Sequence, residues 1–111
     1  MYRLYGLKNC DTCRKAAAWL EAQGKTFRFH DFRKDGLDEA LLERLESTVG
    51  WETLLNRRSA TWRALPEEER AALDRDQAMR LMLRYPALLK RPLLEEGERI
   101  WVGFQPERQH P

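Results

Sequence analysis

Two cysteines three residues apart, Cys10 and Cys13, are the side chains of this 111-residue sequence best suited to covalent chemistry. They enclose Asp11 and Thr12, after a short apolar segment and at the start of a helical pattern. A helix start offers backbone N–H groups without helical partners and the positive end of the helix dipole, and both favour a thiolate over a thiol. We therefore predict that Cys10 is a nucleophile, which Cys13 could resolve by closing a disulfide.

Other uses of the cysteine pair are less consistent with the sequence. A zinc site would usually need four protein ligands, and the available histidines are His30 and His110. We expect no bound metal. An inert buried pair is disfavoured by the position at a helix start, although Cys13 would also suit the inner face of the helix. The spacing beside a βαβ pattern thus indicates redox or nucleophilic use, with the role of Cys13 left open.

Arginines supply the second group of candidate site residues. Arg57, Arg58 and Arg63 lie close together in the sequence and could hold an oxyanion or a carboxylate by forked hydrogen bonds. Solvated surface arginines would explain this cluster equally well. Arg91 precedes Pro92 just ahead of the final strand pattern, and because only about 5–6% of X–Pro bonds are cis, the local sequence favours a trans bond there.

Composition and charge describe an ordinary globular chain, with 42% hydrophobic and 34% charged residues. The net charge of +2 gives no case for a nucleic-acid or membrane partner. Residues 1–36 hold eight Lys or Arg against four Asp or Glu, so positive charge gathers near the cysteines, where it favours a thiolate or an anionic substrate. Arg3, Lys8 and Asp11 interrupt the apolar runs near the start, and we therefore expect a cytoplasmic location.

The elements that must position Cys10 form a strand–helix–strand pattern. Residues 1–6 predict a strand and residues 11–23 a helix, with Gly24 placed where a C-terminal cap belongs. Residues 26–30 alternate Phe27 and Phe29 with polar side chains, which predicts a second strand. Because a helix connects the two strands, we expect them to be parallel.

Helical patterns continue through the middle of the chain before strand patterns return. An apolar stripe covers 37–49, a short segment covers 51–55, and Pro66 opens a helical stretch that lasts until Pro86. At the end, residues 93–94 and 99–103 predict a hairpin around a turn at 95–98. The sequence thus predicts a single α/β thioredoxin-like domain over 1–111, with βαβ, a helical insertion at about 36–90 and an antiparallel β-hairpin.

The sequence resembles the arsenate reductase-related (ArsC) family over nearly its whole length. The matching segments are LYGLKNCDT at 4–12, FHDFR at 29–33, GWETLLN at 50–56, TWR at 61–63, KRPLL at 90–94 and VGF at 102–104. The YffB branch is the most similar, and the Spx-type regulators form a neighbouring branch. The resemblance implies a thioredoxin fold with a helical insertion, in agreement with the order of elements.

The resemblance also implies a site and an activity. Cys10 would be the nucleophile, Pro92 the family's cis proline facing it, and Arg91 would help to bind an anion or glutathione. The expected catalytic residues are Cys10, Cys13 and Arg91, and the expected substrate-binding residues are Asn9, Thr12, Arg58, Arg91 and Pro92. We expect a glutathione-dependent thiol-disulfide reductase with no bound cofactor, which uses glutathione as co-substrate and a thiol, disulfide or oxyanion as substrate.

Arsenate reduction remains an alternative activity. The arsenate reductases of this family surround their oxyanion with three arginines, and Arg91 matches one of them. Arg57 or Arg58 could replace the second only by a shift, and no arginine stands at Gly103 for the third. This departure argues against arsenate as the physiological substrate.

A regulatory role is the other alternative. The pair formed by Cys10 and Cys13 resembles the redox switch of Spx-type proteins, which act by binding the RNA polymerase alpha subunit. In contrast, the matches at Trp51, Trp62 and Phe104 favour the YffB branch. We therefore expect an enzyme, with the polymerase subunit as a partner only under this alternative.

Overall fold

A four-stranded mixed sheet carries the part of the chain that holds both cysteines. The structure is a computed structural model that describes residues 1–104; expectations for His110 lie outside the described residues. The strand order is β2-β1-β3-β4, in which β1 and β2 are parallel and the other neighbouring pairs are antiparallel. The strands are β1 (Tyr2–Gly6), β2 (Phe27–Asp31), β3 (Leu93–Glu96) and β4 (Arg99–Val102). The sheet therefore joins the beginning of the chain to its final hairpin.

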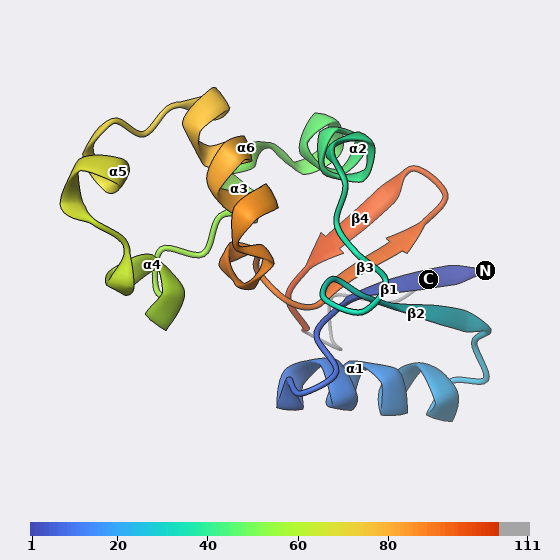
Figure 1. Cartoon of the computed structure of the whole chain (residues 1–111). Coiled ribbons are helices and arrows are strands. Elements are labelled where there is room, and N and C mark those ends of the chain that lie inside the picture. Colours follow the sequence, from blue (N-terminus) through green and yellow to red (C-terminus); the bar gives the residue numbers. More distant parts are fainter. Residues whose placement is uncertain (105–111) are drawn as a thin grey trace. The chain divides into compact units, whose positions relative to one another are not determined.

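Helix α1 (Asp11–Ala22) lies along one face of this sheet (Figure 1). Ala16 and Leu20, one helical turn apart, are buried against Tyr2, Leu4 and Leu94 of the sheet. The helix ends before Gly24, whose φ of 69° is a left-handed conformation that glycine adopts without strain. The apolar face of α1 thus fixes where the helix begins relative to the end of β1.

The chain divides into two compact units, Met1–Gly36 with Arg91–Pro111, and Leu37–Lys90. The second unit is helical. Its elements are α2 (Glu39–Val49), α3 (Trp51–Leu54), α4 (Ala60–Ala64), α5 (Glu67–Ala71), α6 (Arg75–Arg84) and the 3₁₀ turn η1 (Pro86–Leu88). Its buried side chains include Leu42 and Leu45 of α2 and Leu81 and Met82 of α6. No helix among residues 1–104 is long and apolar enough to cross a membrane.

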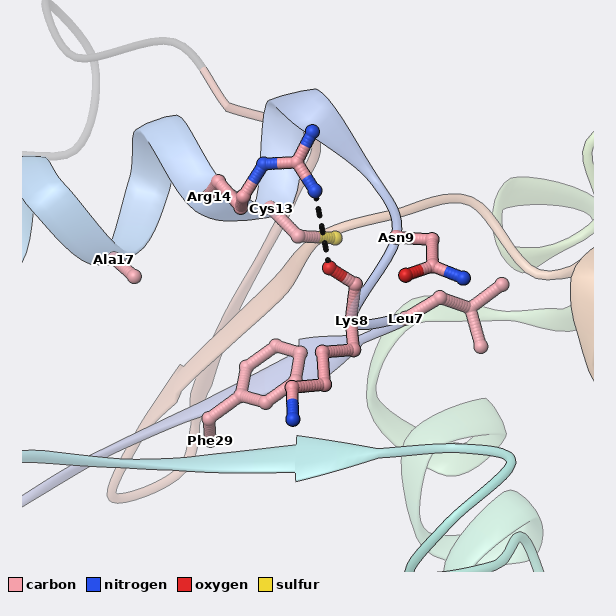
Figure 2. A pocket seen from close by; sticks show the side chains of 7 residues that line it. All are labelled: Leu7, Lys8, Asn9, Cys13, Arg14, Ala17 and Phe29. Atoms are coloured by element: carbon pink, nitrogen blue, oxygen red, sulfur yellow. Dashed lines mark hydrogen bonds between the residues drawn. The ribbon is translucent and has the colours of Figure 1, made fainter.

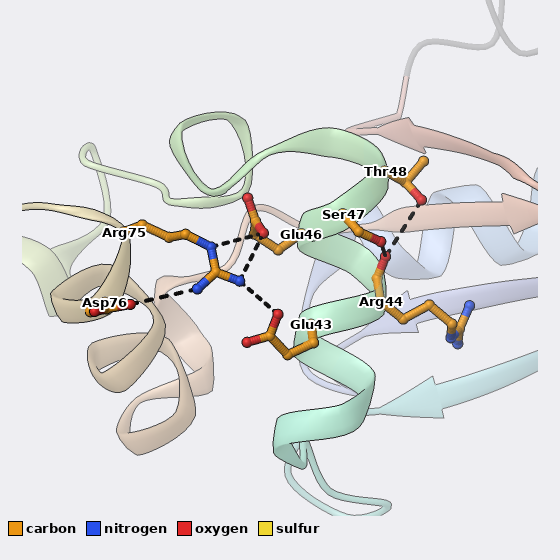
Figure 3. Close-up of polar contacts among 7 residues, drawn as sticks. All are labelled: Glu43, Arg44, Glu46, Ser47, Thr48, Arg75 and Asp76. Carbon is orange, nitrogen blue, oxygen red and sulfur yellow. Dashed lines mark hydrogen bonds and ion pairs between the residues drawn. The ribbon is translucent and has the colours of Figure 1, made fainter.

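Arg75, the first residue of α6, links this helix to α2 (Figure 3). Its guanidinium donates to Glu46 at 3.1 Å and to Glu43 at 2.6 Å. One turn apart on α2, the two carboxylates form a fork that accepts the planar guanidinium. This contact ties two helices that are distant in the sequence.

The helical stretch expected from Pro66 to Pro86 is wrong as a continuous element. Helix α5 ends at Ala71, and α6 begins afresh after Asp74, whose carboxylate accepts the Gln77 N–H at 2.8 Å. A capping aspartate of this kind favours a new helix start over continuation. Helix α4, capped by Ser59 through the Trp62 N–H, was not predicted. The turn expected at 95–98 is shorter, because β3 continues through Glu96.

Candidate active site around Cys10

Cys10 is the N-cap residue of α1, with an extended backbone at φ −102° and ψ 120°. Its N–H donates to the Leu7 carbonyl at 3.2 Å, and its carbonyl accepts the Arg14 N–H at 3.0 Å. The Cys10 side chain is half-buried. The sulfur therefore stands at the positive end of the helix, where free N–H groups stabilise an anion.

Cys13 lies in the first turn of α1 and is buried, with 1% of its surface exposed. Its sulfur lies against Gly6, the last residue of β1, where a Cβ atom would overlap it. Both cysteines are free thiols in this structure. The two sulfurs interact, because the Cys13 thiol hydrogen-bonds to Cys10. Because Cys13 is buried and Cys10 is only half-buried, Cys10 is the more accessible of the two thiols.

The environment separates the two thiols in acidity. Partial burial alone would raise the pKa of Cys10, but hydrogen bonds from the backbone N–H and thiol of Cys13, and the guanidinium of Arg91, lower that pKa overall. Burial and the neighbouring Cys10 raise the pKa of Cys13 to about 12. The arrangement therefore favours a thiolate on Cys10 and a proton on Cys13 at neutral pH.

Arg91 and Pro92 open the segment that leads into β3. The Arg91–Pro92 peptide bond is cis, as the family resemblance implies and contrary to the trans bond favoured by the local sequence. Pro92 is buried, and its carbonyl accepts the Gly103 N–H at 2.8 Å. The Arg91 side chain hydrogen-bonds to Cys10. A cation from a distant part of the sequence thus lies beside the nucleophile.

Asp31, at the end of β2, holds the loop that carries Cys10, and the sequence reasoning missed it. The Asp31 carboxylate accepts the Lys8 N–H at 2.9 Å, the Arg33 N–H at 2.8 Å and the Lys34 N–H at 3.1 Å. Burial alone would raise the pKa of Asp31, but these N–H groups lower it overall. An acidic residue directly after the strand pattern at 26–30 was the signal that could have identified it.

The remaining predicted site residues fall in different places. Asn9 is exposed and lines a pocket beside Cys13, while Thr12 is exposed in the first turn of α1. Arg58 belongs to the helical unit, where its N–H donates to the Asn56 side chain at 3.0 Å, and its part in binding stays a prediction. Among residues 1–104, no three His, Cys, Asp or Glu side chains gather as metal ligands.

Comparison with known proteins adds a family and a fold to this geometry. The model of the ArsC family matches residues 5–110. An uncharacterized protein of Haemophilus influenzae is 40% identical over 104 residues, which cover 94% of this chain and 91% of that protein. A solved YffB protein is 44% identical with a TM-score of 0.91, over 97% of this chain and 95% of that one. An arsenate reductase (ArsC) related protein from Brucella melitensis is 48% identical with a TM-score of 0.81, over 96% and 89%.

More distant similarities include a transcriptional regulator and a glutaredoxin. The global transcriptional regulator Spx of Streptococcus pneumoniae is 28% identical over 94% of this chain and 79% of the regulator. A glutaredoxin from Archaeoglobus fulgidus, 16% identical with a TM-score of 0.52 over 96% of this chain and 78% of that one, shares the fold alone. The predicted thioredoxin-like fold, with its parallel βαβ unit and antiparallel hairpin, is confirmed.

Proposed function

This chain belongs to the ArsC family, and from that premise we propose that it is a glutathione-dependent thiol-disulfide reductase whose nucleophile is the Cys10 thiolate. The observation that carries the proposal is the position of Cys10 as the half-buried N-cap residue of α1, beside Cys13 and Arg91, whose N–H, thiol and guanidinium lower the pKa of Cys10. Such surroundings stabilise the anion that attacks disulfides.

The proposed reaction is two successive thiol–disulfide exchanges. The Cys10 thiolate attacks the glutathione sulfur of a glutathionylated thiol, which forms a Cys10–glutathione disulfide and releases the substrate as a thiolate. The thiolate of a second glutathione then attacks the glutathione sulfur of that disulfide, which releases oxidised glutathione and restores the Cys10 thiolate. The net reaction converts one free glutathione thiolate and the glutathionylated substrate into the substrate thiolate and oxidised glutathione. The substrate sulfur is reduced and the sulfur of the incoming glutathione is oxidised, while Cys10 returns unchanged.

The charge near Cys10 supports glutathione as the co-substrate. Glutathione carries two carboxylates, and a guanidinium binds a carboxylate through paired hydrogen bonds. Arg91 lies at the sulfur itself, and the neighbouring cation Lys8 is exposed on the loop before Cys10. Both cations would attract an anionic thiol to the site.

The protonated state of Cys13 supports a reaction that uses Cys10 alone. A thiol whose pKa is about 12 supplies almost no thiolate at neutral pH, and it is buried against Gly6. In this proposal Cys13 acts as a hydrogen-bond donor to the nucleophile, and external glutathione resolves the mixed disulfide. A resolving role would require its deprotonation after Cys10 has been modified.

A redox-controlled regulator is the second candidate function, favoured by the similarity to Spx and by the contact between the two thiols. In that role, oxidation would join Cys10 to Cys13 and change affinity for the RNA polymerase alpha subunit. A pull-down with the reduced and the oxidised protein tests this role. Binding that depends on the redox state would support the regulator, and equal absence of binding in both states would remove it.

Turnover is the direct test of the enzyme. The mixed disulfide of glutathione and 2-mercaptoethanol serves as substrate, with oxidised glutathione recycled by glutathione reductase and NADPH consumption as the signal. We expect Cys10→Ser to abolish turnover and Cys13→Ser to retain part of it. Loss with both variants would assign Cys13 as the resolving thiol, and no turnover of the native protein would contradict the proposal. Arsenate in place of the disulfide, in the same assay, tests arsenate reduction.

A further inference from the structure

A pocket of about 400 Å³ opens beside the first turn of α1, on the side of Cys13 (Figure 2). Its apolar wall consists of Leu7, Ala17 and Phe29, together with the Cys13 side chain. This volume lies within the usual range for small-molecule sites, roughly 300–1,000 Å³. The proposed exchange of glutathione on Cys10 does not assign any role to this wall.

Phe29 supplies an aromatic ring to the lining of the pocket. Its side chain is 36% exposed, and within residues 1–104 the other exposed large hydrophobic is Met1 at the end of the chain. Phe29 also stands on β2, an edge strand of the sheet. Its ring therefore offers a partly open aromatic surface beside the apolar wall of the pocket, which an apolar group of a ligand could contact.

The rim of the pocket is polar and held in place before any ligand arrives. The Lys8 N–H donates to the Asp31 carboxylate at 2.9 Å, and the Lys8 carbonyl accepts from Arg14 at 3.3 Å. Both backbone polar groups of Lys8 are therefore held by hydrogen bonds, and a preorganised site loses less entropy on binding. Asn9 adds an exposed amide to the same rim.

The charges at the rim specify what the pocket can take. Arg14 is paired with Asp11, so its charge is balanced within α1. Lys8 is exposed, and within residues 1–104 no carboxylate forms an ion pair with its amine. One uncompensated cation beside an apolar hollow is complementary to a ligand with a single negative charge and an apolar body.

We propose that this pocket is a binding site for small amphipathic carboxylates, whose aromatic or branched apolar group lies against Phe29 and Ala17 and whose carboxylate faces Lys8. Cys13 is part of the wall, and its thiol in turn hydrogen-bonds to Cys10. A bound ligand would therefore lie next to the residue whose thiol stabilises the nucleophile. Binding does not require turnover, so the site stands independently of the proposed reductase activity.

The test is titration of the ¹⁵N-labelled, reduced protein with phenylacetate, followed by amide chemical shifts. We expect shifts centred on Lys8, Cys13, Ala17 and Phe29, with a dissociation constant of about millimolar order for so small a probe. Phenylacetamide, the neutral isostere, should bind roughly two- to fivefold more weakly, because it lacks the interaction with one exposed cation.

Matched variants separate the pocket from the rest of the surface. Ala17→Phe fills the pocket and should abolish the shifts, whereas Ala18→Phe places the same ring on an exposed neighbouring position and should not. Lys8→Gln should make phenylacetate and phenylacetamide bind equally, and Lys15→Gln, an exposed cation outside the pocket, should preserve their difference. Equal binding of phenylacetate by Ala17→Phe and Ala18→Phe would overturn the proposal, as would chemical-shift changes centred away from Phe29.

Discussion

The sulfur of Cys13 occupies the space that a side chain on Gly6 would need. A Cβ atom at Gly6 would approach this sulfur closer than 3.0 Å, a separation that real Cβ atoms essentially never show. Gly6 is not among the glycines with positive φ, so it is the missing atom, and not backbone freedom, that matters here. The end of β1 thus makes room for the thiol that donates to Cys10.

Gly6→Ala should therefore destabilise the protein through its contact with Cys13. We expect a loss of about 1–3 kcal/mol in the free energy of unfolding, the usual cost of overpacking a core, measured by urea denaturation. In a Cys13→Ala background the nearest atom would be the Cβ of residue 13 at 3.4 Å, an ordinary contact, so the added methyl should cost much less. An equal cost in both backgrounds would contradict this contact.

The two thiols should titrate far apart. Reactivity follows the thiolate, so alkylation of Cys10 by iodoacetamide should rise with pH through a pKa below that of an ordinary cysteine. Cys13, whose pKa is raised to about 12, should remain unmodified across the neutral range. Peptide mapping of the native protein at a series of pH values measures both sites. Equal labelling of the two cysteines near pH 7 would refute the assignment.

Arg91 should set part of this difference. Arg91→Met removes a hydrogen bond and a positive charge from Cys10, and should raise the pKa of its thiol and slow alkylation at neutral pH. Arg91→Lys keeps the charge without the planar fork and should give an intermediate pKa. Arg99→Met, at an exposed position of β4, is the control and should leave the Cys10 profile unchanged. A Cys10 pKa that does not respond to Arg91→Met would exclude a direct interaction.

Asp31 should couple the stability of the protein to acid pH. Its pKa is lowered in the folded state, so the stabilisation by its carboxylate is fully present above the unfolded value, about 3.9, and is lost as the pH falls through the folded value. Asp31→Asn should cost about 1–3 kcal/mol at pH 7, because three N–H groups lose a charged acceptor, and should flatten the decline below pH 4. Glu98→Gln, in the exposed hairpin turn, is the control. If the free energy of unfolding declined equally with falling pH in the native protein and in Asp31→Asn, the role of Asp31 would be contradicted.

Local patterns were sufficient to predict the first unit of the fold. The apolar face of α1, the cap at Gly24 and the alternation around Phe27 depend on neighbouring residues, and these elements appear where the sequence placed them. The helical unit was predicted less well. A new helix start at Asp74 depends on a side chain competing with the helical backbone, and helical spacing on both sides hid this break.

Of the candidate site, only the residues whose roles depend on neighbouring sequence could be predicted from the sequence itself. Cys10 was found because its chemistry depends on a helix start that is visible locally. Gly6 was predicted only as the end of the first strand, because its contact with Cys13 exists only once β1 and α1 pack together. The contact of Arg91 with Cys10 spans most of the chain, and it was expected from family resemblance and not from spacing.

The most direct test of the proposed reaction is to trap its intermediate on Cys10. The native protein is mixed with excess of the mixed disulfide of glutathione and 2-mercaptoethanol, quenched in acid, and mapped by mass spectrometry before and after the addition of free glutathione. The proposal predicts one glutathione joined to Cys10, removed by free glutathione and absent from Cys10→Ser. A glutathione found on Cys13 alone, or no adduct on the native protein, would contradict Cys10 as the nucleophile.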